Sequence, residues 1–157
     1  VPLLDTLAAV FGIGAAVRVS DVEPFLGTGG DVAPWDLTDA IDAGDVPKSL
    51  DCLARMLDAG GRHPLAVMAS LHGHFGRLLR LDGADVRNEV EVADMLGIKG
   101  FPAKKALQVS RRIGPGKVAR AIRLIAAADL DLRGRSAWPP ELVVEVLVAR
   151  LASLARR

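Results

Sequence analysis

Hydrophobic residues along this chain recur mainly at three- and four-residue intervals, which is the spacing of an amphipathic helix. Sustained two-residue alternation is missing. The 157 residues include no tyrosine, four Phe and two Trp, so the aromatic content typical of strands is low. The pattern predicts an all-α helical bundle of about eight helices joined by short loops.

Glycine and proline residues set the limits of the predicted helices. The stretch 27–34 has three glycines, one proline and little apolar content, which makes it the best linker candidate. Before it, residues 2–11 are expected to end a helix, and Ser20 with Glu23 has the spacing of a capping box. After it, we expect a helix over residues 36–43 and a second one that Asp45 caps and Gly60-Gly61 ends. Further helices are expected over residues 64–81, 89–96, 102–113 and 117–132, and from 139 onwards.

The longest predicted helix, residues 64–81, contains two histidines and two glycines. His72 belongs to its apolar stripe and is expected to pack in the bundle, with His74 at the margin. Gly73 and Gly76 are expected to let another helix approach closely. The stripe itself is expected to face the core: Leu65, Met68, His72, Phe75 and Leu79.

The chain shows no sign of secretion or of membrane insertion. A single cysteine excludes an internal disulfide and is compatible with a reducing compartment. No apolar run reaches the roughly 18 residues that a membrane span needs. The N-terminus lacks the basic and apolar regions of a signal peptide. We therefore expect a cytoplasmic protein that does not associate with a membrane.

Phosphate-binding and metal-binding patterns are also missing. The glycine-rich segments lack the GxxxxGK[ST] layout of a phosphate loop, since Gly116-Lys117 is followed by Val118. His72 and His74 lie two positions apart on a predicted helix, so they point in different directions and cannot share a metal ion. We expect neither a cofactor nor a metal site.

Nucleophilic and acid–base catalysis find no better support. Cys52 lies between Leu50 and Leu53 in an amphipathic helix, where a buried and inert thiol is expected. Neighbouring carboxylates are expected on solvated faces: Asp39 with Asp42, Glu89 with Glu91, and Asp129 with Asp131. The sequence therefore predicts no catalytic residue.

The charge is distributed unevenly, although the total is only +1. Residues 1–98 carry 7 basic and 15 acidic residues, a balance of −8, whereas residues 99–157 carry 13 and 4, a balance of +9. This asymmetry indicates either an oriented binding surface or two solvated faces that differ. The segment 101–128 has no acidic residue and seven basic ones: Lys104, Lys105, Arg111, Arg112, Lys117, Arg120 and Arg123.

The seven basic residues are expected to form a partly contiguous surface. Such a surface can contact the phosphates of DNA or pair with an acidic neighbouring subunit. No aromatic residue is interleaved with these basic residues, which weakens the case for a site that stacks single-stranded bases. A solvated face without a partner remains the simplest alternative.

Short motifs with a fixed order and spacing run through the chain. They are residues 20–25, WDLTDAIDAGD at 35–45, Gly60-Gly61 followed by Pro64, Phe101-Pro102, ADLDLRG at 128–134 and ELVVEVLVARL at 141–151. Together they resemble the helical C-terminal part of the delta subunit of the bacterial DNA polymerase III clamp loader. The resemblance covers nearly the whole chain, although each motif alone consists mostly of residues that begin or end helices.

The resemblance implies a domain organisation and a function. Residues 1–30 correspond to the C-terminal part of the family's helical lid domain, and residues 34–157 to its collar domain, through which clamp-loader subunits associate. The family's N-terminal ATPase-like domain, which contacts the sliding clamp, has no counterpart here. Since the chain starts at Val1 within an apolar pattern, we expect it to be part of a longer protein or a protein with a trimmed start.

The function implied is that of a helical assembly module for loading the sliding clamp onto DNA during replication. The expected partners are other clamp-loader subunits, with DNA contacted through the assembled complex. We expect no nucleotidyl transfer by this chain alone, since the polymerase activity belongs to the holoenzyme. Another subunit of the same loader is an alternative within the family. A stand-alone helical domain that binds nucleic acid through residues 99–123 is an alternative outside it.

Overall fold

The computed structural model describes residues 8–12, 18, 32–58 and 61–156, and all of its regular elements are helices. No strand occurs among these residues, which confirms the all-α prediction. From residue 34 onwards the elements are α3 (Pro34–Ala43), α4 (Val46–Leu57), α5 (Pro64–Leu81), α6 (Glu89–Leu96), α7 (Phe101–Ile113), α8 (Pro115–Leu130), the π-helical η2 (Asp131–Arg135) and α9 (Pro140–Ala155).

The predicted lid remnant, residues 1–30, falls largely outside the described residues, as do the Ser20 cap and most of the proposed linker. Residues 8–11 are helical, as expected for the tail of a helix, and Gly12 follows them with a φ of 87°. Val32 already packs into the core and α3 begins at Pro34. The division into lid and collar domains stays a prediction.

Capping residues explain where the helices begin and end. Gly44 ends α3 in the left-handed conformation with a φ of 74°, as its position in the sequence predicted. The Asp45 carboxylate accepts a hydrogen bond of 3.0 Å from the backbone N–H of Lys48, which caps α4. Asn88 caps α6 in the same way, and Gly97 ends that helix.

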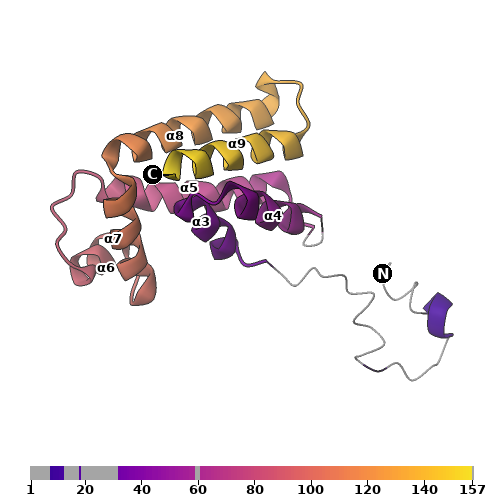
Figure 1. The fold of residues 1–157 in the computed structure, drawn as a ribbon, viewed down its shortest axis with the longest axis horizontal. Helices are drawn as coiled ribbons and strands as arrows, with labels where there is room; N and C mark the ends of the chain where they lie inside the picture. Colours follow the sequence, from indigo (N-terminus) through magenta and orange to yellow (C-terminus); the bar gives the residue numbers. More distant parts are fainter. Residues whose placement is uncertain (1–7, 13–17, 19–31, 59–60, 157) are drawn as a thin grey trace.

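The C-terminal helix α9 lies at the centre of the bundle. It contacts α3, α4, α5 and α8, so it joins segments from both ends of the described bundle (Figure 1). Val144, Leu147, Val148 and Leu151 of α9 are all almost completely buried. A second, smaller core lies where α6 and α7 meet the end of α5, around Leu81, Val92 and Ala103.

The buried face of α5 differs from the predicted stripe. Met68 and Phe75 are buried as expected, but Leu65 and Leu79 are 48% and 42% exposed, and His72 is exposed as well. The helix has enough apolar residues for two stripes, and packing against α8, α7 and α9 selects the one rotated toward Val67, Leu71 and Leu78. The stripe prediction is therefore wrong for three of its five members.

The expectations for His72 and for the two glycines of α5 are also wrong, whereas His74 lies at the margin of the bundle as expected. His74, and not His72, is the partly buried histidine. A Cβ added at Gly73 would meet only the end of the Arg77 side chain at 3.9 Å, and one added at Gly76 would meet nothing within 4 Å. No neighbouring helix among the described elements approaches α5 closely at either glycine.

The predicted helix 117–132 begins two residues earlier and ends differently. α8 ends at Leu130 and is followed directly by η2, within which Gly134 leaves the helical conformation with a φ of 99°. Two ion pairs with i,i+4 spacing hold this turn: Arg133 with Asp129 at 2.9 Å and Arg135 with Asp131 at 2.8 Å. Within the described part of the chain, no helix combines the length and apolar character that crossing a membrane requires.

Gly44 is the glycine at which a side chain should be most harmful. An added Cβ would lie 2.9 Å from Cα of Arg156, and an L-residue with positive φ is strained even without that contact. We predict that Gly44→Ala lowers the free energy of unfolding by about 2 kcal/mol. Urea denaturation followed by the helical circular dichroism signal measures this.

The matched control is Gly76→Ala. Gly76 lies within α5, and its added methyl group would meet open space. Because alanine favours a helix over glycine, this change should raise the free energy of unfolding by up to about 1 kcal/mol. Equal stability of Gly44→Ala and the unmodified protein would contradict the close approach between the end of α3 and the C-terminus.

Candidate functional site

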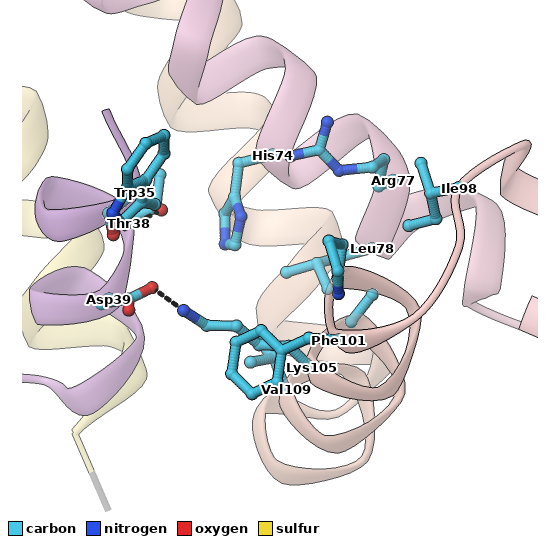
Figure 2. A pocket seen from close by; sticks show the side chains of 12 residues that line it. Trp35, Thr38, Asp39, His74, Arg77, Leu78, Ile98, Phe101, Lys105 and Val109 are labelled. Carbon is cyan, nitrogen blue, oxygen red and sulfur yellow. Dashed lines mark hydrogen bonds and ion pairs between the residues drawn. The ribbon is translucent and has the colours of Figure 1, made fainter. Parts of the chain in front are cut away.

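A cleft of about 450 Å³ opens between α3, α5 and α7 (Figure 2). Two aromatic side chains flank it: Trp35 from the first turn of α3 and Phe101 from the start of α7, which are 66% and 73% exposed. Leu78 and Val109 contribute apolar surface, while Arg77 and His74 reach it from α5. Large apolar side chains with this exposure, gathered around one cleft, are typical of an interaction surface.

An ion pair crosses this cleft. Lys105 of α7 reaches across to the Asp39 carboxylate of α3, as Figure 2 shows. The Lys105 ammonium also lies 5.9 Å from the centroid of the Phe101 ring, within the range of a cation–π interaction. Both partners of the ion pair keep contact with solvent, so its contribution to stability is small. Its effect is to fix Lys105 between the two helices.

A buried carboxylate lies one turn further along α3. Asp42 is only 3% exposed, and its Oδ1 lies 2.9 Å from Nε2 of His74 on α5. Arg112 of α7 donates a hydrogen bond to the main-chain oxygen of the same residue. The second carboxylate oxygen, Oδ2, has no hydrogen-bond partner among the described residues. Asp42 thus links three helices.

The solvated face predicted for Asp39 and Asp42 is therefore wrong for Asp42. The reason is tertiary: α5 and α7 cover this end of α3 and supply its polar partners. Asp129 and Asp131 do lie on a more open surface. The hydrogen bond from Arg133 lowers the pKa of Asp129, and the hydrogen bond from Arg135 lowers the pKa of Asp131. Cys52 is buried as predicted, and burial raises the pKa of its thiol.

The seven basic residues of the predicted surface are distributed over several faces. Lys105 and Arg112 line one hollow beside α3, and both bind acceptors on that helix. Arg111 donates to the main-chain oxygen of Arg87 at 2.8 Å. Lys117 donates to the main-chain oxygen of Arg156 at 2.9 Å. Three of the seven are therefore held by main-chain oxygens and one by a carboxylate.

The remaining three members are Lys104, Arg120 and Arg123, and all are exposed. Their side chains form no hydrogen bond or ion pair with the described residues, so they are open to an external anion. That the seven residues together bind DNA or an acidic subunit stays a prediction.

A second open groove runs between α8 and α9. It measures about 680 Å³, and four basic residues line it: Lys117, Arg120, Arg150 and Arg156. Arg150 and Arg156 lie outside the basic segment 101–128, so the sequence alone did not indicate that they share a surface with Lys117 and Arg120. The helical pairing of α8 with α9 brings them together.

Sequence reasoning also missed the aromatic component of the first cleft. Trp35 and Phe101 are far apart in sequence and frame the cleft beside Lys105 only because α3 and α7 meet there. The basic region therefore has aromatic neighbours, contrary to the sequence-based expectation. No group of three or more His, Cys, Asp or Glu side chains that could hold a metal ion occurs in the described part of the chain.

The Asp42–His74 contact gives a direct test of this arrangement. We predict that His74→Ala lowers the free energy of unfolding by about 2 kcal/mol, because it leaves a buried carboxylate without its side-chain partner. His72→Ala is the matched control, since His72 is exposed on the same helix and its loss should change stability by less than about 0.5 kcal/mol. Urea denaturation of both variants distinguishes them, and an equal effect would contradict the reported burial.

Comparison with known proteins identifies the family. A search of curated proteins found no match to the chain. A family model described as "DNA polymerase III delta subunit, C-terminal domain" matches residues 34–151. The match starts with the first residue of α3 and ends within α9, so it includes the whole of the first cleft and most of the groove between α8 and α9, of which Ser153, Leu154 and Arg156 lie beyond the match. The chain belongs to the family of C-terminal domains of the DNA polymerase III delta subunit.

Proposed function

We propose that this bundle is an assembly module of the replicative clamp loader, which associates with other loader subunits when the sliding clamp is placed on DNA. The observation that carries the proposal is the family match over residues 34–151, because it spans every element from α3 almost to the end of α9. In this role the bundle acts as a collar domain and binds its neighbours through helix faces.

The surface of the bundle suits such a role. Exposed large apolar side chains occur on several helices, including Trp35 on α3, Val90 on α6 and Phe101 on α7. Trp35 lies on α3, which packs into the main core, whereas Val90 and Phe101 lie on the helices of the second, smaller core around Leu81, Val92 and Ala103. Association would remove their apolar surface from water, which is the main favourable term in most protein–protein contacts.

The bundle is proposed to act by binding alone. Contact with the sliding clamp belongs to the family's ATPase-like domain, and polymerase activity belongs to the holoenzyme. The cytoplasm, where replication takes place, is the proposed location. Incorporation of labelled nucleotide by the purified chain would contradict the non-enzymatic part of the proposal.

The assembly proposal is tested by size-exclusion chromatography of the chain with the other clamp-loader subunits. At micromolar concentration we predict that the chain elutes with them, because helix faces that bury apolar surface support stable association. An unrelated helical protein of similar mass serves as the control and should elute separately. Separate elution of the present chain would overturn the proposal.

A second candidate function is direct binding of DNA beside the first cleft. Phe101 and Trp35 are exposed there, and Lys105 and the unpaired Lys104 lie on the same helix as Phe101. Aromatic faces can stack on unpaired bases, and lysines can contact phosphates without reading sequence. This candidate is compatible with assembly, since DNA could be contacted within the complex.

Fluorescence anisotropy of labelled single-stranded DNA at several salt concentrations tests this candidate. Affinity should fall steeply with salt. Lys104→Ala should make the slope of log affinity against log salt shallower by about 1, because one phosphate contact is lost. Lys48→Ala, which removes an exposed lysine on α4, should leave the slope unchanged. Arg112 and Lys117 are poorer choices, since each also holds a main-chain oxygen. A salt-independent affinity would contradict direct phosphate contact.

A further inference from the structure

The groove between α8 and α9 combines basic rims with an apolar floor. Arg120 and Arg150 are exposed on opposite helices, and Lys117 and Arg156 lie toward its end. Between them lie Leu124 and Leu154, which are half-buried and packed against the core. Every lining residue comes from α8, α9 or Arg156, so none of the other described helices lines it.

The groove continues along the two helices toward η2. A smaller hollow of about 120 Å³ shares Leu124 and Arg150 with it and extends to Trp138, which is 54% exposed. Figure 1 shows α8 and α9 side by side, with α9 between α8 and the helices α3, α4 and α5. Each helix has 16 residues, so at 1.5 Å per residue the paired surface is about 24 Å long. Several turns of another helix fit that length.

The charge of the groove is of one sign. Its lining includes four basic side chains and no acidic one. The adjoining hollow contains the carboxylate of Asp131, which lies near enough to Arg150 to be influenced by it but is hydrogen-bonded to Arg135. The N-terminus of α8 and the C-terminus of α9 meet at the Lys117 end of the groove, so the partial charges of these two helix ends largely offset each other and the basic side chains set the sign.

We propose that this groove binds an acidic amphipathic helix of a neighbouring clamp-loader subunit. The apolar face of that helix covers Leu124, Leu154 and Trp138, and its carboxylates pair with Arg120, Arg150 and the cations at the end of the groove. This inference rests on the proposed function, and it names the chemistry of one partner surface. It is an example of a helix laid in a groove and anchored at i, i+3, i+4 and i+7 positions.

A protein helix fits these features better than a nucleic acid does. Backbone phosphates would engage the arginines and lysines but leave the leucine floor without an apolar partner. The part of the groove with the four basic residues has no aromatic side chain, and Trp138 in the adjoining hollow is a single aromatic residue, which is too little to stack a run of bases. Apolar floor and basic rims together match an amphipathic partner of negative charge.

A pair of charge reversals on one helix tests the assignment. Arg120→Glu places an acidic residue in the groove, whereas Arg123→Glu makes the same change three residues further along α8, outside the groove lining. Neither arginine has a hydrogen-bond or ion-pair partner among the described residues, so both variants should fold normally. Thermal unfolding monitored by circular dichroism checks this first.

Affinity for the purified remaining subunits is then measured by biolayer interferometry at 0.15 M salt. We expect Arg120→Glu to weaken association at least tenfold and Arg123→Glu to change it less than twofold. Raising the salt concentration should lower the affinity of the unmodified protein and of Arg123→Glu for the subunits. The affinity of Arg120→Glu should fall less, because that variant has already lost one of the charge pairs that salt screens. The DNA affinity of the same variants is measured by the fluorescence anisotropy of labelled DNA, without the other subunits.

Cysteine crosslinking identifies what lies in the groove. Ser153→Cys puts an exposed thiol in the groove, and Ala126→Cys puts one on α8 outside the groove lining. The natural Cys52 is buried, so the reagent should not reach its thiol. With a maleimide–diazirine crosslinker, whose light-activated end needs no thiol on the partner, the Ser153→Cys variant should be joined to a peptide of a neighbouring subunit that is acidic and amphipathic, and the Ala126→Cys variant should not.

Equal effects of the two reversals, or a crosslink from the Ser153→Cys variant to a basic or non-helical segment, overturn the groove assignment while leaving the assembly proposal intact. Loss of DNA binding by Arg120→Glu with unchanged affinity for the subunits assigns the groove to nucleic acid and overturns the helix proposal. If the unmodified protein binds none of the subunits, the proposed function fails and the groove assignment fails with it.

Discussion

The burial of α9 among four other helices is the interaction on which the rest of this structure depends. α9 contacts α3, α4, α5 and α8, so the last helix in the sequence completes the core that the earlier helices begin. Replacing a buried leucine such as Leu147 or Leu151 by alanine would cost about 2–5 kcal/mol, a large part of the stability of a domain this size. At the same end, Gly44 gives the C-terminus room to pass close to α3.

A polar connection complements this apolar one. The Asp42 side chain meets His74 of α5, and the Asp42 main-chain oxygen meets Arg112 of α7, so the end of α3 is fixed to both helices that frame the first cleft. Buried polar groups of this kind are costly when they lose a partner. The two clefts thus arise from one framework: α3, α5 and α7 shape the first, and α8 with α9 shapes the second.

The sequence predicted the helices well because their limits are local. Gly44, Asp45, Asn88 and Gly97 act within one turn of their own position, so capping rules that use only neighbouring residues apply to them. The choice of buried face on α5 is not local. Two apolar stripes were available there, and only the positions of other helices decide that Leu71 and Leu78 are buried while Leu65 and Leu79 are not.

The candidate sites could be predicted only in part for the same reason. Sequence singled out the basic segment correctly as a stretch without acidic residues, but the fold separates its members and supplies several with internal partners. Arg150 and Arg156 join Lys117 and Arg120 only through the pairing of α8 and α9, and Trp35 joins Phe101 only through the meeting of α3 and α7. Such combinations depend on tertiary contacts that spacing along one helix cannot reveal.

If this bundle takes part in a clamp loader as proposed, it should lie in the ring of collar domains. An electron cryomicroscopy reconstruction of the loader assembled with this chain would show where the bundle lies. We expect density for α3 to α9 within the ring, with a neighbouring helix against the face formed by α8 and α9. A reconstruction in which the bundle lies outside the ring, with both clefts facing solvent, would contradict the proposed role.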